Sequence, residues 1–362
     1  MRRLVPENVE RLVPYSPGKP IEELERELGI KNAVKLASNE NPRGPSPLAI
    51  EAMRAAATAV NRYPDAATFE LRRELAEHHG LASMDELVMG NGSNELIDLI
   101  CRTYAGPEDH AVIGVPSFVC YHLGLTTANV PYDAVPLREH LFWDLPDGRA
   151  RRTSAPCRSR RQPEQPDRRP RRPRGARQAF LRSCPPSVLV AFDEAYVEFK
   201  PTRALRLGSC ASCSERLIVL RTFSKAYGLA ANRVGYAIGR PDVVGYLNRT
   251  RAPFNVGSIS QAAARAALKD PGHVAEYVEL NRTERARVTA ALEAMGLRVA
   301  PSQANFVFVD FARDNREVYD RMLRMGVIIR PMPKPVDTWL RITIGLPEEN
   351  DRLIGAVREL VG

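Results

Sequence analysis

A lysine and a carboxylate each follow an apolar run of this chain. Asp193 comes directly after Val188–Phe192, and Lys225 lies shortly after Leu217–Leu220. A lysine amine can form a Schiff base with a carbonyl, and a carboxylate can keep a pyridine nitrogen protonated so that the ring accepts electrons. Pyridoxal phosphate is a cofactor that needs both groups. We therefore expect a pyridoxal-phosphate enzyme if the two side chains meet in one crevice.

The two apolar runs must place these side chains. Their length and their β-branched residues are typical of buried parallel strands. Ligands of open α/β sheets bind at the carboxyl ends of such strands, so Asp193 and Lys225 should face a common crevice. The sequence therefore predicts an α/β fold with the site at one edge of the sheet.

A glycine-containing turn at residues 90–95 is a second candidate site. It lies between a predicted strand and a predicted helix. Glycines let the backbone approach a ligand closely, and the free amides of a helix N-terminus favour an anion. We expect Gly92, Ser93 and Asn94 to bind a phosphate group, together with the cation Arg233.

Three stretches of the chain resemble fold-type-I pyridoxal-phosphate aminotransferases, most closely the histidinol-phosphate aminotransferase branch. They are DEAYVEF at 193–199, RTFSKAYGLAANRVGYAIG at 221–239 and RITIG at 341–345. The resemblance implies a large domain, built on a mostly parallel seven-stranded sheet flanked by helices, and a smaller α/β domain.

The same resemblance implies three divisions of the chain. Residues 1–46 would form an N-terminal arm and part of the small domain. Residues 47–250 would form the large cofactor-binding domain, and residues 251–362 the small C-terminal domain. It also implies a homodimer with shared active sites, because the equivalent of Tyr63 in relatives reaches the cofactor phosphate of the neighbouring subunit.

Individual roles follow from the resemblance as well. Lys225 would carry the Schiff base, Asp193 would pair with the pyridine nitrogen, and Tyr196 would contact the phenolic oxygen. Phe118 would stack its ring on the cofactor. The cofactor phosphate would be bound by Thr222, Ser224 and Arg233.

Substrate contacts are expected from the arm and from the small domain. The resemblance places Tyr15 of the arm near the substrate, with a packed N-terminal helix as the alternative for the arm. Asn39 lies in the stretch LASNENPRGPSP, whose polar side chains can face a ligand. Arg341 stands among apolar neighbours, where a guanidinium needs an anionic partner, and its planar fork suits a carboxylate. The resemblance gives Arg341 the substrate carboxylate and Arg330 the distal phosphate. A structural salt bridge is the alternative role for either arginine.

The implied reaction transfers the amino group of histidinol phosphate to 2-oxoglutarate in histidine biosynthesis, through a Schiff base on Lys225. An aromatic-amino-acid aminotransferase and a phosphothreonine decarboxylase of the same fold are alternatives. The expected partners are a small-molecule amino donor and a 2-oxo acid.

The net charge of +9 belongs to one segment. Residues 149–177 hold twelve arginines and two acids, whereas the rest of the chain has 40 basic and 41 acidic residues. A nucleic-acid-binding protein is an alternative from another class, but it depends on this segment alone.

There is no membrane-length apolar run, no signal-peptide core and no regular cysteine framework. We expect a cytoplasmic enzyme with no metal, nucleic-acid or membrane partner.

Hydrophobic periodicity stops between about residues 142 and 178. A disordered basic loop would explain the composition. However, the family carries Asn-Pro-Asn-Asn-Pro-Thr-Gly here, and this chain lacks it. We wrote Ala-Asn-Pro-Asn-Asn-Pro-Thr-Gly with codons that end in G or C, and placed one C before them. Translation that starts one base early, at this C, gives Arg-Gln-Pro-Glu-Gln-Pro-Asp-Arg. This octapeptide is the sequence of residues 161–168. We therefore hypothesise a shifted reading frame.

The shift has a chemical consequence at Gln165. This residue takes the place of the asparagine that, in the family, donates a hydrogen bond to the phenolic oxygen of the cofactor. Glutamine is one methylene longer, and a donor misplaced by about 1 Å loses much of its catalytic value. We expect the chain as translated to be weakly active.

Overall fold

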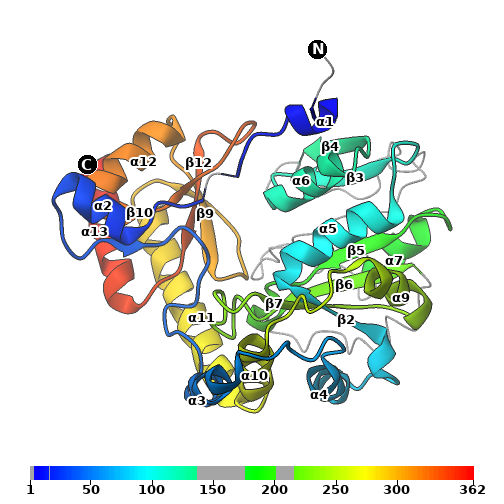
Figure 1. Cartoon of the computed structure of the whole chain (residues 1–362). Coiled ribbons are helices and arrows are strands. Elements are labelled where there is room, and N and C mark those ends of the chain that lie inside the picture. Colours follow the sequence, from blue (N-terminus) through cyan, green and yellow to red (C-terminus); the bar gives the residue numbers. More distant parts are fainter. Residues whose placement is uncertain (1–3, 16, 137–175, 201–215) are drawn as a thin grey trace.

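The computed structural model describes residues 4–15, 17–136, 176–200 and 216–362 (Figure 1). Within these ranges, two four-stranded sheets have the strand orders β2-β7-β6-β5 and β11-β12-β9-β8, and β3-β4 and β1-β10 form two pairs. The strands are β1 (Val34–Lys35), β2 (Leu87–Asn91), β3 (Ala111–Val115), β4 (Tyr132–Pro136), β5 (Val190–Asp193), β6 (Leu217–Thr222), β7 (Val234–Ile238), β8 (Arg298–Ala300), β9 (Phe306–Asp310), β10 (Val327–Ile328), β11 (Arg330–Pro331) and β12 (Trp339–Thr343).

Helices cover these sheets. The α-helices are α1 (Glu7–Glu10), α2 (Ile21–Leu28), α3 (Pro47–Ala56), α4 (Phe69–His79), α5 (Gly92–Tyr104), α6 (Val119–Thr127), α7 (Ala176–Ser183), α9 (Pro241–Thr250), α10 (Ser258–Leu268), α11 (Pro271–Ala294), α12 (Asn315–Arg324) and α13 (Pro347–Val361). Short 3-10 helices are η1 (Ala57–Ala59), η2 (Met84–Glu86) and η5 (Val197–Phe199).

The strands β5 and β6 lie side by side and parallel, with Asp193 opposite Leu220. This confirms that the two apolar runs are parallel strands and shows that they are neighbours. The strand β7 is antiparallel to both β2 and β6, whereas β3 and β4 are a separate parallel pair. The described chain thus supplies six strands for this region, in two sheets, where seven were expected in one.

The strand β6 is apolar along most of its length because both faces of its sheet are covered. Leu217 and Val219 point into a core shared with α3, α4 and α10, whereas Ile218 and Leu220 point into a core shared with α5, α6 and α9. Successive side chains of a strand point to opposite faces, so a doubly covered strand needs apolar residues throughout. Figure 1 shows α5 on one side of the sheet and α3, α4 and α10 on the other. The predicted α/β fold class is confirmed.

The second sheet is covered by helices on one face. Val307 and Val309 of β9 and their neighbours in β12 pack with α11, α12 and α13. The alternate residue Phe306 belongs to the opposite face, and its ring centroid lies 5.4 Å from that of Tyr196, just after β5. The face of the second sheet that α11, α12 and α13 do not cover therefore lies next to the edge of the first sheet that carries Asp193.

One predicted strand of the second sheet is divided. The sequence predicts a strand over Gly326–Arg330, but β10 pairs parallel with β1 and β11 pairs antiparallel with β12. The chain passes from one sheet to another within this run, so the hydrogen-bond partners change although the apolar character continues. The pairing of β1 with β10 also joins the N-terminal segment to residues near the C-terminus.

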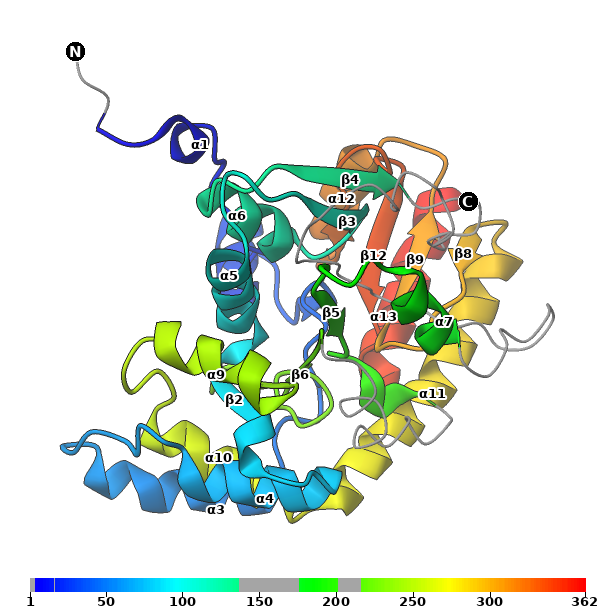
Figure 2. The same ribbon diagram turned by 90° about the vertical axis from the view of Figure 1, so that its right-hand side faces the viewer.

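The proposed divisions at 46/47 and 250/251 stay a prediction. The helix α10 lies beyond the second division, yet its residues Ala263, Ala264 and Ala267 pack in the core with α3 and α4. The helix α11, which is 24 residues long, runs from this helix layer to the second sheet (Figure 2). None of the helices in the described ranges is long and apolar enough to cross a membrane.

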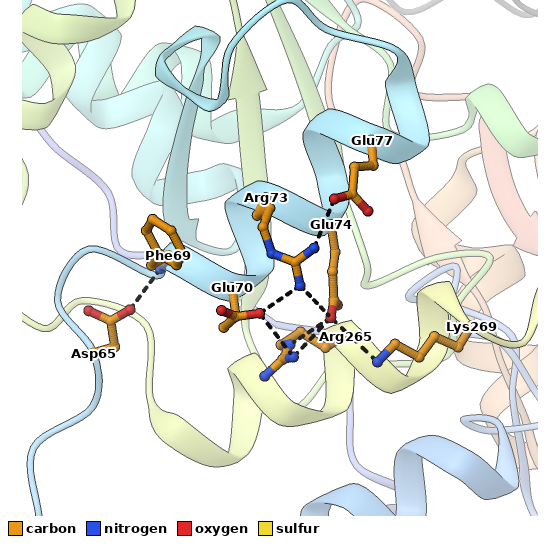
Figure 3. A network of polar contacts seen from close by, with 8 residues as sticks. All are labelled: Asp65, Phe69, Glu70, Arg73, Glu74, Glu77, Arg265 and Lys269. Carbon is orange, nitrogen blue, oxygen red and sulfur yellow. Dashed lines mark hydrogen bonds and ion pairs between the residues drawn. The ribbon is translucent and has the colours of Figure 1, made fainter.

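An ion-pair network fastens α4 to α10 on the outer surface (Figure 3). Glu74 Oε1 lies 2.9 Å from Arg265 Nη2 and 3.4 Å from Lys269 Nζ. Burial raises the pKa of the Glu74 carboxyl, but the hydrogen bonds and charges of Arg265 and Lys269 outweigh it and hold the pKa below its usual value. Ion pairs at the surface thus connect α4 to α10, in addition to the packing of the α10 alanines in the core.

Candidate active site

Lys225 lies in the turn that follows β6. Its Nζ donates to the carbonyl oxygen of Ser38 at 3.1 Å and lies 6.0 Å from the ring centroid of Tyr196. Gly228 allows the turn to form, because its φ is +70° and a Cβ there would collide with the backbone of Gly44. The lysine is therefore held on a turn that packs closely against the loop containing Gly44.

The carboxylate of Asp193 lies at the end of β5. Tyr121 Oη donates to its Oδ2 at 2.9 Å, and the amide of Ala195 donates to its Oδ1 at 3.1 Å. Tyr196, three residues further on, approaches the amine of Lys225. The acid and the amine thus come from adjacent parallel strands at the same edge, as the sequence predicted.

Asn39 links this edge to the second sheet. Its Nδ2 donates to Tyr196 Oη at 2.7 Å, and Thr343 Oγ1 donates to its Oδ1 at 3.1 Å. The side chain is 1% exposed and its φ is +55°. The amide of Asn39 therefore connects Tyr196 to Thr343 of β12. The direct substrate contact that the sequence predicts for Asn39 stays a prediction.

A cation lies against the N-terminus of α5. A Cβ on Gly92 would overlap the guanidinium of Arg233, and a Cβ on Gly235 would lie 2.5 Å from the amide nitrogen of Ser93. Arg233 Nη1 donates to Ser224 Oγ at 3.4 Å. The residue that precedes α5 makes no side-chain cap hydrogen bond to its first turn. The amides at the start of α5, the Arg233 guanidinium and the Ser224 hydroxyl therefore lie close together, at a place where a side chain larger than glycine would not fit. Such a set of donors suits a phosphate group.

Other predicted cofactor residues surround this edge. Thr222 Oγ1 accepts a hydrogen bond from the amide of Ser224 at 3.1 Å and so closes the turn before the lysine. Asn94 is exposed in the first turn of α5, and Phe118 is the residue before α6. Gln165 lies outside the described residues. Their contacts with a cofactor stay predictions.

Two arginines stand opposite each other in the second sheet. Arg330 of β11 is the register partner of Arg341 of β12. The Arg341 guanidinium lies 5.9 Å from the ring centroid of Phe306, and that of Arg330 lies 5.5 Å from the ring centroid of Tyr15. Like charges directly across a strand pair repel, so anions nearby would stabilise this arrangement. The structure thus brings Tyr15, Arg330 and Arg341 together.

Tyr63 is 83% exposed and stacks on Phe254, with ring centroids 4.7 Å apart. The two rings lie near a shallow pocket of about 600 Å³ that is lined by residues 60–64 and 257–260. This surface is where the sequence places a contact with a neighbouring subunit.

Sequence reasoning missed a buried ion pair beside the site. Arg221 Nη2 lies 2.8 Å from Glu194 Oε2, and both residues are buried. Burial also raises the pKa of the nearby Glu198 carboxyl to about 7. It lowers the pKa of His79 to about 3, so the His79 imidazole is neutral when it forms its hydrogen bond with the Tyr236 hydroxyl. The signal in the sequence was a charged residue within one buried strand, Arg221 in β6, and another directly after its neighbour, Glu194 after β5.

The residues fit pyridoxal phosphate. Arg233 and the glycine-lined N-terminus of α5 could hold its phosphate, Asp193 could hold its ring nitrogen, and Lys225 could hold its carbonyl carbon. In the part of the chain that the structure describes, no three His, Cys, Asp or Glu side chains are placed to hold a metal ion. The site has the donors for an organic phosphate.

Comparisons with known proteins identify the family of this chain. A family model described as aminotransferase class I and II matches residues 31–151 and 178–357. The chain is 41% identical over 365 residues to the histidinol-phosphate aminotransferase of Anaeromyxobacter sp. (strain Fw109-5), covering 99% of each, and 42% identical over 363 residues to histidinol-phosphate aminotransferase 2 of Pseudomonas aeruginosa, covering 98% and 96%.

The fold also matches a solved structure. The crystal structure of histidinol-phosphate aminotransferase from Sinorhizobium meliloti, in complex with pyridoxal-5'-phosphate, superposes with a TM-score of 0.85 at 27% identity, over 99% of this chain and 97% of that one. The family match and the two sequence relatives extend over most of the chain. This chain therefore belongs to the class I and II aminotransferase family.

Proposed function

We propose that this protein transfers the amino group of histidinol phosphate to 2-oxoglutarate, with pyridoxal phosphate as cofactor. One observation carries the choice of substrate: Arg330 and Arg341 stand in register on the sheet face next to Tyr196. Relatives about 40% identical over nearly the whole chain are named for this reaction.

The residues of the chain divide the work of the reaction. Pyridoxal phosphate, when bound, supplies an electron-accepting ring that allows a proton to leave the substrate carbon bearing the amino group. Lys225 Nζ would take that proton and return it to the carbon on the other side of the amino nitrogen, which is general acid and base catalysis by one amine. Asp193 keeps the ring nitrogen protonated, and Arg233 with the amides of Gly92 and Ser93 binds the phosphate.

The paired arginines account for two different substrates. Histidinol phosphate has a phosphate and no carboxylate, whereas glutamate and 2-oxoglutarate have two carboxylates. A guanidinium binds either group with two parallel hydrogen bonds. Arg330 binds the phosphate of histidinol phosphate, and Arg341 binds the carboxylate that glutamate and 2-oxoglutarate carry on the reacting carbon, so that both substrates fit between the sheet face and Lys225.

We expect kcat/KM for histidinol phosphate to exceed that for phenylalanine by at least tenfold. A hydrogen bond to a charged group contributes about 1.5–3 kcal/mol, and phenylalanine has no distal anion for Arg330. Steady-state turnover with each donor and 2-oxoglutarate measures the ratio. Arg330→Gln should lower the ratio toward one, whereas Arg316→Gln on the exposed side of α12 should leave it unchanged. Faster turnover of phenylalanine, or release of carbon dioxide from phosphothreonine, would contradict the proposal.

We further propose that two chains associate through the surface around Tyr63. An exposed ring stacked on the partly exposed Phe254 is apolar area that a second copy can cover. We expect a mass in sedimentation of about twice the 40.3 kDa of one chain. Tyr63→Ser together with Phe254→Ser should shift the protein toward monomer and lower turnover, whereas Tyr246→Ser, at a 51% exposed tyrosine of α9, should do neither. A fully active monomer of the unmodified chain would refute this arrangement.

We also propose that the reading frame is shifted around residues 142–178. The family match supports this, because it stops at residue 151 and resumes at residue 178. The octapeptide at 161–168 is the one-base-early reading of the family motif. Resequencing the gene decides the point, since an uninterrupted frame that encodes these arginines, with no compensating insertion or deletion, would remove the hypothesis.

Finally, we propose a cytoplasmic location. The sequence holds six cysteines without the regular spacing of a disulfide framework, as is usual in a reducing compartment. Fractionation of the source cells tests this, and activity confined to a membrane or secreted fraction would disprove it.

A further inference from the structure

The hydroxyl of Tyr121 lies on the carboxylate of Asp193. The side chain is 1% exposed, and its ring packs in the core with Ile113, Leu125 and Ala191. Its Oη donates to Asp193 Oδ2 at 2.9 Å, although the two residues are 72 positions apart in the chain. A buried hydroxyl without an acceptor is costly, and this one is directed at the acid that meets the cofactor ring.

Two donors hold the plane of this carboxylate. Tyr121 donates to Oδ2 and the amide of Ala195 donates to Oδ1. The terminal torsion of an aspartate is otherwise broad, so a free carboxylate would sample many orientations. A carboxylate offers about four lone-pair sites, and these two donors leave sites on the same group for a third donor. The remaining lone pairs therefore point in a direction that the protein sets before any ligand arrives.

The start of α6 carries two elements of the site. Phe118 precedes the helix, and the amide of Tyr121 donates to its carbonyl oxygen at 3.1 Å. The ring expected to stack on the cofactor and the hydroxyl on its acid therefore belong to the same turn. Because the Tyr121 ring is enclosed by the core, this turn cannot shift without repacking it.

From this geometry we propose that Tyr121 is a positioning residue, which acts through Asp193 by aiming the carboxylate at the ring nitrogen of the cofactor. The proposal rests on the proposed function, since it needs a pyridine ring at this place. Packing alone does not require the hydroxyl, because phenylalanine has the same ring shape.

The test is Tyr121→Phe, with Tyr132→Phe as its matched control. Tyr132 lies on β4 in the same unit, and its hydroxyl contacts His122 rather than Asp193. We expect Tyr121→Phe to weaken the binding of pyridoxal phosphate about tenfold, measured by quenching of protein fluorescence, and to lower kcat about tenfold with little change in KM for the amino donor. The melting temperature of the cofactor-free protein should equal that of the control.

A double-mutant cycle separates positioning from stability. Asp193→Asn alone should weaken cofactor binding, and adding Tyr121→Phe to it should cause no further loss, because the hydroxyl acts through the acid. Additive losses, or a lower melting temperature with unchanged cofactor affinity, would overturn the positioning role alone. If the unmodified protein binds no pyridoxal phosphate at all, the proposed function fails and this inference fails with it.

Discussion

Lys225→Ala is expected to lower kcat by about 10⁴-fold. The substitution removes the group that takes the proton from the substrate carbon and also the amine that attaches the cofactor, and proton transfer by a positioned side chain alone contributes about 10²–10⁴-fold. Turnover of histidinol phosphate at saturating pyridoxal phosphate measures the loss. The absorption spectrum of the bound cofactor should also change, because its carbonyl carbon no longer bonds to the protein.

The control for this experiment is Lys269→Ala. That lysine belongs to the surface network with Glu74, and 62% of its side chain is exposed. We expect wild-type turnover from it, with at most a small loss of stability, because exposed ion pairs contribute about 1 kcal/mol or less. Turnover by Lys225→Ala within tenfold of the unmodified chain would show that another group carries the proton, and the assignment of the site would fail.

Restoring the reading frame across residues 142–178, with Ala-Asn-Pro-Asn-Asn-Pro-Thr-Gly in place of 161–168, should raise kcat/KM about 10²-fold. The restored asparagine supplies a hydrogen-bond donor for the phenolic oxygen of the cofactor, and loss of one such preorganised donor typically costs 10²–10³-fold. Side-by-side assays of the chain as translated and the restored chain, at equal cofactor saturation, measure the gain.

Two matched variants identify the source of that gain. A restored chain with glutamine in place of the asparagine before Pro-Thr-Gly tests the donor itself, and should lose most of the increase. A restored chain with that asparagine replaced by alanine should behave similarly if the donor is responsible. Equal kcat/KM for the translated and restored chains would mean that the segment contributes nothing to catalysis.

Local sequence was sufficient for the elements and for most of the edge of the sheet. The runs before Asp193 and Lys225 are apolar because helices cover both faces of their strands, and that burial leaves a continuous signal in the sequence. The helix α2 ends at Leu28 and is followed by Gly29 with φ +65°, a backbone conformation that favours glycine. Elements whose cause lies within a few residues were therefore found with close to correct bounds.

The family resemblance supplied roles that spacing alone could not. Nothing in the composition distinguishes Arg233 from the other arginines of the chain. Its placement against Gly92, where a Cβ would collide with it, is visible only once α5 and β7 lie together. The same holds for the division of the predicted strand near residue 328 between two sheets, because an apolar run does not specify its partners.

The sequence by itself determined the fold class, the two parallel strands β5 and β6, and the presence of an acid and a lysine at their ends. The tertiary structure decided which side chains hold those groups. Tyr121 reaches Asp193 across 72 residues and Asn39 reaches Tyr196 across 157, while Arg330 meets Arg341 through strand register. Such contacts depend on how whole elements pack, since a short segment specifies its own backbone conformation but not the distant surface that it will meet.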